Sequence, residues 1–307
     1  MPTPSWKRLQ MISDAVLMPT SSPGVHARSQ PFEQVIAGLN ALITRERDPA
    51  TEVLHFPPVM SRAVLERQGY HKNFPHLLGC VCSLDGTEAE IRALLPSYAV
   101  GTNAVPGRSW LNALAPTDLV LSPAACYPLY PLVSGRGPVR AQGQLFDVGS
   151  YCFRREATHE VGRLQSFRMR EFVAMGAPQI ANVFRRNWIA RAERLAQQLG
   201  LPYRLAGASD PFFGRVGKML AVSQVEQALK FELLIPIDSE DAPTACMSFN
   251  YHQEHFGATW GLRTDEDQVA HTSCVAFGLD RLGLALFATH GSELARWPAA
   301  VGQALSL

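Results

Sequence analysis

Two strand-like runs on either side of a polar loop constrain this chain more than any other feature. The first run ends in Phe153-Arg154-Arg155-Glu156, and the second is Phe167-Arg168-Met169-Arg170-Glu171-Phe172. Because side chains alternate faces along a strand, Cys152, Arg154 and Glu156 share one face of the first strand. We therefore expect a strand pair that presents charged side chains on one face.

The second strand carries a chemically mixed face. Phe167, Met169 and Glu171 point to the same side. At about 3.3 Å per residue, Phe167 and Glu171 lie roughly 13 Å apart. Unpaired buried charge costs several kcal/mol, so a purely structural strand pair seldom needs Arg and Glu on one buried face. A long ligand with a flat base at one end and phosphates in its middle would account for this combination.

Composition narrows the class of protein. The chain has 307 residues, 47% hydrophobic and 18% charged, which is enough for a large core. Its net charge of +1 lacks the basic excess of a protein that mainly grips nucleic acid. No run approaches the roughly 18–20 apolar residues that span a bilayer, and the N-terminus lacks the order of a secretory signal. We expect a cytoplasmic protein with no membrane partner and reduced cysteines.

Apolar periodicity predicts an α+β fold. We expect a mixed, mostly antiparallel sheet flanked by helices, because strand signals cluster between short polar turns. Residues 1–307 are predicted to form one domain that begins with an irregular arm over about 1–31. Residues 211–226 are less regular. Helices are predicted at 32–43, 61–68, 87–95, 180–199 and 278–289, and strands at 77–84, 143–156, 167–175, 228–237, 245–251 and 269–277.

Three segments, in order, resemble the signature motifs of class II aminoacyl-tRNA synthetases. Residues 153–156 with 163–167 resemble motif 2, and Gly278-Leu279-Asp280-Arg281 after an apolar strand resembles motif 3. Residues 55–76 resemble motif 1, which builds the dimer interface in that family. Each motif alone is weak, but the ordered set covers roughly residues 50–290. The resemblance implies a class II synthetase-like core, ATP with Mg²⁺, and a homodimer.

A finer resemblance indicates one subfamily. Cys126, Glu171 and Cys274 resemble the zinc ligands of the atypical seryl-tRNA synthetases. Their truncated relatives, the amino acid:[carrier protein] ligases, keep these ligands and lack the N-terminal tRNA-binding domain. A chain of 307 residues with a near-zero net charge has no room for that domain, so we favour the carrier-protein ligases. The resemblance implies one Zn²⁺ per subunit.

The chemistry of these three residues suits the metal. Two thiolates and a carboxylate favour Zn²⁺, and three protein ligands leave one position open, which the substrate amino group takes in the resembled family. The alternative is that Cys126 and Cys274 are small buried hydrophobic residues. We expect that ordinary role for Cys80, Cys82 and Cys152.

The same resemblance assigns five residues to ATP. Arg154 is expected to hold the α-phosphate, where charge builds as the amino acid carboxylate attacks, and Glu156 to accept from the adenine amino group. Phe167 would stack on adenine, Arg163 would bind the outer phosphates, and Arg281 would clamp adenine or the γ-phosphate. Arg154 and Arg281 are the predicted catalytic residues. Structural alternatives stay open, among them an Arg154–Glu156 ion pair and solvated loop or helix charges.

Further nucleotide contacts are predicted on two later strands and beside Arg163. Lys230 and Glu232 share a strand face, where they would help to hold Mg²⁺ and ATP or simply pair with each other. Residues 244–250 stand where synthetases carry a Glu-(Ile/Val)-Ser-Ser segment, but the acidic residue is absent here, which leaves the Mg²⁺ ligands in doubt. The additional predicted contacts are Leu164, Lys230, Glu232, Ala245 and Ser248.

The implied reaction has two steps. ATP activates a small amino acid, glycine or alanine, as an aminoacyl-adenylate, and the phosphopantetheine thiol of a carrier protein then takes the aminoacyl group. A helical insertion at about 205–227 corresponds to the segment that docks the carrier in the resembled family. No tRNA is expected as a partner. The alternatives are a true seryl-tRNA synthetase and a catalytically silent paralogue that binds or regulates a partner.

Overall fold

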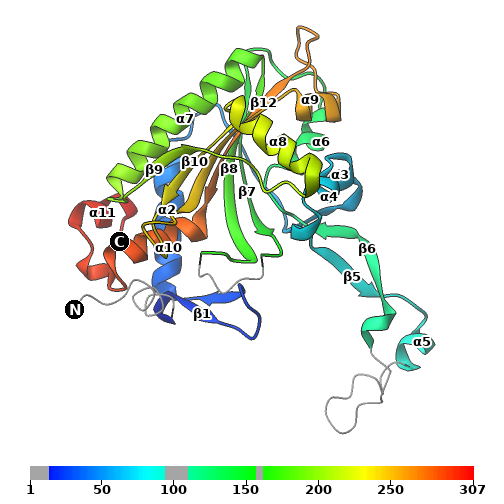
Figure 1. Ribbon diagram of the computed structural model, residues 1–307, viewed down its shortest axis with the longest axis horizontal. Helices are drawn as coiled ribbons and strands as arrows, with labels where there is room; N and C mark the ends of the chain where they lie inside the picture. The colour runs from blue at the N-terminus through cyan, green and yellow to red at the C-terminus, as the bar shows by residue number, and fades with distance from the viewer. Residues whose placement is uncertain (1–13, 94–109, 157–161) are drawn as a thin grey trace.

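A seven-stranded sheet forms the centre of the computed structural model, which describes residues 14–93, 110–156 and 162–307 (Figure 1). The strand order is β3-β7-β8-β12-β11-β10-β9. Strands β3 and β7 are parallel, and all other neighbours are antiparallel. The predicted mixed, mostly antiparallel sheet is confirmed. Its strands are β3 (Glu52–His55), β7 (Gln144–Phe153), β8 (Ser166–Gly176), β9 (Arg204–Gly207), β10 (Lys230–Ile235), β11 (Thr244–Gln253) and β12 (His271–Gly278).

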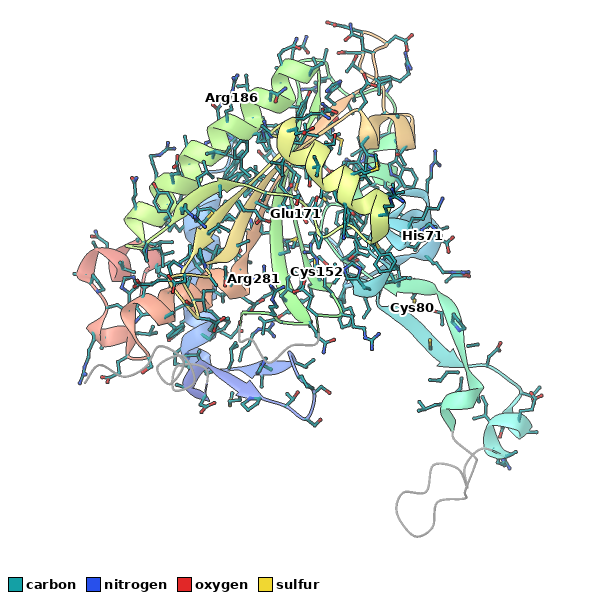
Figure 2. The ribbon with its side chains drawn as sticks, viewed as in Figure 1. His71, Cys80, Cys152, Glu171, Arg186 and Arg281 are labelled. Carbon is teal, nitrogen blue, oxygen red and sulfur yellow. The ribbon has the colours of Figure 1, made fainter. Side chains whose placement is uncertain are left out.

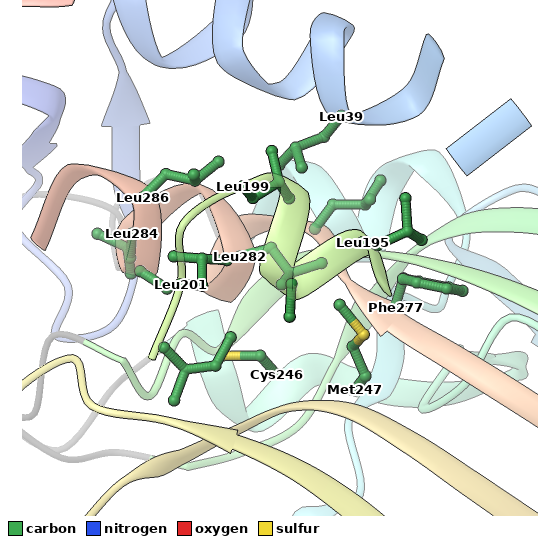
Figure 3. Close-up of a cluster of buried hydrophobic side chains, with 14 of the residues drawn as sticks. Leu39, Leu195, Leu199, Leu201, Cys246, Met247, Phe277, Leu282, Leu284 and Leu286 are labelled. Atoms are coloured by element: carbon green, nitrogen blue, oxygen red, sulfur yellow. The ribbon is translucent and has the colours of Figure 1, made fainter. Parts of the chain in front are cut away.

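Four helices pack with one face of the sheet into the largest hydrophobic core (Figures 1 and 3). Helix α2 begins after Ser29, whose hydroxyl accepts from the backbone N–H of Phe32, and its apolar residues recur at helical spacing. Helix α7 ends before Gly200, whose φ of +61° suits glycine. The predicted helices at 32–43, 180–199 and 278–289 are confirmed. The four are α2 (Gln30–Arg45), α7 (Pro178–Gln198), α10 (Leu279–His290) and α11 (Ala299–Leu305).

The opposite face of the sheet, called the polar face below, carries the predicted metal ligands. Phe172 and Val275 belong to the helix-covered core, so their neighbours Glu171 and Cys274 face the other way. A second apolar cluster forms there around the stacked rings of Tyr130 and Phe256, 3.9 Å apart. The helices on this side are α3 (Arg62–Arg67), α4 (Tyr70–Asn73), α6 (Leu129–Ser134), α8 (Gly214–Glu226) and α9 (His255–Trp260).

The N-terminal arm is more ordered than predicted. Strands β1 (Leu17–Pro19) and β2 (His26–Arg28) form a hairpin, and residues 1–13 of the arm lie outside the described residues. Arg28 donates from Nε to Asp280 Oδ1 at 2.8 Å, and Arg168 donates to the same oxygen at 2.8 Å. The wholly buried Asp280 carboxylate therefore ties this hairpin to the start of α10.

A smaller three-stranded sheet extends away from the body as an arm (Figure 1). The predicted capping box is confirmed, because Thr87 N–H donates to Glu90 Oε2 at 2.6 Å and Glu90 N–H to Thr87 Oγ1 at 3.3 Å. The last residues of that predicted helix lie outside the described residues. Cys80 and Cys82 are exposed on this arm, which corrects the expectation that they are buried; Cys152 is buried. The elements are β4 (Val59–Ser61), β5 (Cys80–Leu84), β6 (Leu114–Leu121) and α5 (Glu88–Ala93), with short 3₁₀ turns at Pro75–Leu77, Trp110–Ala113 and, elsewhere, Leu294–Arg296.

One boundary near the predicted site differs from expectation. Strand β7 ends at Phe153, because Arg155 turns away to donate its N–H to Leu77 O, so Arg154 and Glu156 lie beyond the strand. Residues 214–226 form helix α8 inside the segment predicted as a helical insertion, although their local pattern indicated less regular structure. Among the helices of the described ranges, none combines the length and hydropathy of a membrane-spanning segment.

Candidate active site

A pocket of about 400 Å³ opens on the polar face of the sheet. Strands β8, β10, β11 and β12 form its floor, and α4 and α8 contribute to its walls. Figure 2 shows Glu171 near the centre of the molecule, with Arg281 below it in the same view. The size suits a small-molecule substrate. The predicted residues that line it are Cys126, Arg154, Phe167, Glu171, Lys230, Glu232, Ala245, Ser248, Cys274 and Arg281.

Three of these residues form a buried cluster of potential metal ligands. One ligand atom from each of Cys126, Glu171 and Cys274 lies within 4.8 Å of the others. The Cys274 thiol donates to Glu171 Oε2 at 2.7 Å, and the backbone N–H groups of Ala125 and Cys126 donate to Oε1 at 2.7 and 3.3 Å. Two adjacent strands and a loop therefore bring together residues that are far apart in sequence.

The electrostatics of the cluster fit a bound cation. Glu171 is 1% exposed, and no ion pair joins it to a basic side chain of the described residues. Burial raises the pKa of the Cys274 thiol well above its usual value. The hydrogen bond with Cys274 favours the Cys126 thiolate, but burial and the Glu171 carboxylate outweigh it and raise the pKa of Cys126. A divalent ion would reverse both shifts, because it binds the thiolate form.

Arg154 enters the pocket from the turn after β7. Its Nε donates to the carbonyl of Pro123 at 3.1 Å, and its guanidinium lies 5.6 Å from the ring centre of Phe167. The backbone N–H of Arg154 still donates to Gln165 O, which keeps the turn close to β8. Since one edge of the guanidinium is fixed, the rest can face an anion in the pocket. Phe167 and Glu171 line the same pocket, as strand alternation predicted.

Arg281 enters from the first turn of α10. Its Nε donates to Gly162 O at 2.8 Å and its Nη1 to Ala245 O at 3.1 Å. These two carbonyls hold the guanidinium across the end of β11. Glu156 Oε2 lies 3.2 Å from Arg163 Nη1 and 3.9 Å from Arg281 Nη2. Among the described residues, the ion-pair partners found for Glu156 are these two arginines. The structural alternative, an ion pair between Arg154 and Glu156, is not among them.

Lys230 and Glu232 pair with each other on β10, at 2.9 Å from Nζ to Oε1. Lys230 Nζ also lies 2.7 Å from Asp210 Oδ1. The ion pair between Lys230 and Glu232 was the structural alternative for these residues, and it is present. Both side chains also line the pocket, where a ligand could reach them.

Three predicted residues do not line the pocket. Leu164 is buried in the main hydrophobic core. Arg163 is half exposed in the loop beyond β7, and Glu156 lies beside it. The resemblance to motif 2 placed all three near the nucleotide. In the structure, side chains in this turn alternate between core and solvent, so Arg163 is exposed and Leu164 is buried.

Comparison with known proteins identifies the family. Two amino acid–[acyl-carrier-protein] ligases of Bradyrhizobium diazoefficiens are each 54% identical to this chain over 299 residues, which is 97% of this chain and 88% and 90% of those proteins. The chain belongs to the amino acid–[acyl-carrier-protein] ligases. A type-2 serine–tRNA ligase of Methanopyrus kandleri is 29% identical over 58% of this chain and 36% of its own length. A scan of protein-family profiles finds no match.

Solved structures place the ligase in the class II synthetase fold. The M. kandleri seryl-tRNA synthetase in complex with A. aeolicus tRNASec superposes with a TM-score of 0.82 at 21% identity, over 97% of this chain and 60% of that one. The Pyrococcus horikoshii seryl-tRNA synthetase complexed with ATP superposes with a TM-score of 0.66 at 16% identity, over 99% and 62%. The predicted class II synthetase-like core is confirmed.

Several pocket residues of the ligase were missed by sequence reasoning. Gln68 and Tyr70 line the pocket, and Gln68 Oε1 and Tyr70 Oη are buried with no hydrogen-bond partner among the described residues. Asp210 and Gln224 line it from the ends of the α8 segment. Gln68 and Tyr70 lie in the segment that resembles motif 1, and Asp210 and Gln224 lie in the predicted insertion, but neither resemblance assigned these four residues a role at the pocket.

Proposed function

We propose that this ligase activates a small amino acid with ATP and passes it to the phosphopantetheine thiol of a carrier protein. The amino acid carboxylate attacks the α-phosphorus of ATP, which releases pyrophosphate and leaves an aminoacyl-adenylate. The carrier thiol then attacks the acyl carbon, which releases AMP. The observation that carries the proposal is the buried Cys126–Glu171–Cys274 cluster beside Arg154 and Arg281 in one pocket.

The nucleotide end of the pocket is the part that holds Arg154, Phe167 and Arg281. An adenine stacked on Phe167 would lie within reach of the Arg281 guanidinium, and the phosphates would extend toward Arg154. Positioning and charge neutralisation supply most of the catalysis in phosphoryl transfer, so these arginines are the proposed catalytic groups. Arg163 and Glu156 lie at the loop above, where Arg163 would meet the outer phosphates and Glu156 the adenine amino group. Glu232, Lys230, Ser248 and the Ala245 backbone are the proposed partners of ATP and Mg²⁺.

The amino acid end is the part that holds the metal cluster. Cys126, Glu171 and Cys274 would hold a Zn²⁺ ion, whose chemistry is to bind and orient the substrate amino group. N-blocked amino acids and hydroxy acids should therefore be poor substrates. Selectivity for glycine or alanine would come from steric exclusion, which is worth about 1–3 kcal/mol per methylene.

Helix α8 is the proposed docking surface for the carrier. It exposes a row of large apolar side chains, with Val216 70% and Met219 69% exposed, next to Arg215 and Lys218. A group of large apolar side chains that are exposed on one helix is typical of an interaction surface. Its inner residues line the pocket, so a carrier on α8 would have a short path for its thiol. The homodimer built by residues 55–76 remains a prediction.

Amino-acid-dependent pyrophosphate exchange, followed by transfer of labelled product, tests this function. We expect exchange with glycine or alanine and transfer to a holo-acyl carrier protein but not to tRNA. Arg154→Ala should lower exchange by about 10²–10³-fold, the usual cost of removing one donor to a developing charge. Transfer to tRNA alone would identify a seryl-tRNA synthetase, and no exchange with any amino acid would identify a silent paralogue.

A further inference from the structure

Helix α8 is anchored unlike any other long helix of the described chain. Of its 13 residues, Gly217 alone is buried. Helices shorter than about 12–15 residues are marginal in water by themselves, and most depend on a buried apolar face. Since α8 has no such face, other contacts must hold it against the pocket. Most of its large apolar side chains point outward instead, at Val216, Met219, Val222 and Val225, while Leu220 lines the pocket and is 42% exposed.

A polar network supplies one anchor. Gln224 Oε1 accepts from the Asp210 backbone N–H at 2.7 Å, and Gln224 Nε2 donates to Asp210 Oδ2 at 2.8 Å. Asp210 Oδ1 in turn accepts from Lys230 Nζ at 2.7 Å, and Lys230 is a buried residue of β10. The last turn of α8 is thereby tied to the floor of the pocket through one carboxylate.

An aromatic contact supplies the second anchor, at the other end of the helix. The rings of Phe212 and Phe74 stack with centres 5.1 Å apart, and Phe213 N–H donates to Asn73 O at 2.8 Å. Gly217 lets the helix approach this entry, because a Cβ there would lie 2.7 Å from the Phe212 carbonyl carbon. The aromatic anchor fixes where α8 begins, while the network fixes its direction across the pocket.

We propose that Gln224 and Asp210 are positioning residues that hold α8 where the carrier docks. This inference rests on the proposed role of α8 as the docking surface. Both hydrogen bonds of the Gln224 amide go to a single residue, and that residue is held by a charge-assisted bond to the sheet, so loss of the amide frees the last turn of the helix. Arg154 and Arg281 are held by backbone carbonyls outside α8, so release of that turn should affect carrier transfer more than adenylate formation.

Gln224→Ala tests the proposal, with Gln227→Ala as the matched control. Gln227 is an exposed glutamine one residue beyond α8, and its amide bonds to Ser223 and Gln253 at the surface. Three quantities are measured in each variant: hydrogen exchange of amides 214–226 and 166–176, pyrophosphate exchange, and kcat/KM for a holo-acyl carrier protein. In Gln224→Ala we expect amides 214–226 to exchange at least about tenfold faster, in line with the loss of one charge-assisted hydrogen bond.

The same variant should lose about tenfold in kcat/KM for the carrier, lose clearly less in pyrophosphate exchange, and leave amides 166–176 unchanged. Equal exchange at 214–226 in both variants overturns the anchoring role. Faster exchange there with an unchanged carrier kcat/KM overturns the role in docking. Gln224→Glu keeps the side-chain length but sets a second carboxylate against Asp210, so it should show the same pattern more strongly even if Gln224→Ala folds poorly. Failure of the proposed function itself appears in the wild type, as absent carrier transfer, and does not alter the hydrogen-exchange result.

Discussion

The metal-ligand cluster and helix α8 lie at the same pocket but are built in opposite ways. Glu171 and Cys274 are buried on two central strands, each paired on both sides. Helix α8 buries one residue and depends on side-chain hydrogen bonds for its position. The sheet therefore fixes the candidate metal ligands, whereas the proposed docking surface is attached through a few side chains and can loosen without disturbing those ligands.

Removal of a candidate zinc ligand should have the largest effect and should act on the sheet side of this comparison. Cys126→Ala should lose zinc and amino acid activation together, by at least about 100-fold, because even outer partners of metal ligands cost 10–100-fold. Zinc content and pyrophosphate exchange are the measurements. Cys152→Ala is the matched control: Cys152 is also a buried cysteine but does not belong to the cluster, so it should keep its zinc. Full activity of a zinc-free Cys126→Ala protein would contradict the metal site.

A charge on the outer face of α8 should weaken carrier binding without changing adenylate formation. Met219→Glu is expected to raise the KM for a holo-acyl carrier protein by at least about tenfold, since a charge replaces an apolar contact at an interface. Pyrophosphate exchange should stay unchanged, because Met219 is 69% exposed and does not line the pocket. Val183→Glu on α7, where Val183 is 42% exposed, is the control and should change neither quantity. A comparable loss in both variants would break the assignment of α8.

Lower pH should reduce the free energy of unfolding through His252 on β11. Burial lowers the pKa of His252 to about 3, and its Nδ1 lies 3.0 Å from Thr272 Oγ1. The unfolded chain binds a proton below its usual pKa of about 6.5 and the folded protein does not, so stability is lost as pH falls from 6.5 toward 3, at up to about 1.4 kcal/mol per pH unit. His252→Asn should flatten this dependence in urea unfolding between pH 7 and 4. Parallel curves for the two proteins would rule the effect out.

The smallest expected effect is a gain in stability, whereas most substitutions lower stability. Tyr70 Oη is buried without a partner among the described residues, so Tyr70→Phe should stabilise the protein by up to about 1 kcal/mol. Tyr251→Phe is the matched control, because Tyr251 Oη lies 2.5 Å from His271 Nδ1 and its loss should destabilise by a similar amount. Urea unfolding measures both. Destabilisation by Tyr70→Phe would show that its hydroxyl has a partner in solution.

The central sheet was predictable because its signals are local. Strand alternation alone placed Phe167 and Glu171 on one face, and helical spacing located α2, α7 and α10. Resemblance then grouped the metal ligands, which the fold confirms as a cluster. Strand propensity could not show that β7 stops at Phe153, since the stop depends on a hydrogen bond from Arg155 to the distant Leu77.

The resemblance predicted a helical insertion around α8, but periodicity alone did not predict the helix. Val216, Met219 and Leu220 follow helical spacing, yet they are exposed, so the spacing does not mark a face toward the core. The hairpin β1–β2 was not predicted, because strands of three residues are too short to show alternation. The exposure of Cys80 and Cys82 depends on an arm that leaves the body, which no residue type reveals.

The short attachments of α8 also bear on acceptor engineering. The helix joins the strands on either side through Asp210 and Leu229, and the hydrogen bond from Leu229 N–H to Gln224 O closes its far end. Under the proposed docking role, residues 211–228 form a cassette for exchange between related ligases, provided that Asp210, Gln224 and Lys230 are kept. Such chimaeras are expected to keep the amino acid preference of one parent and to take the carrier preference of the other.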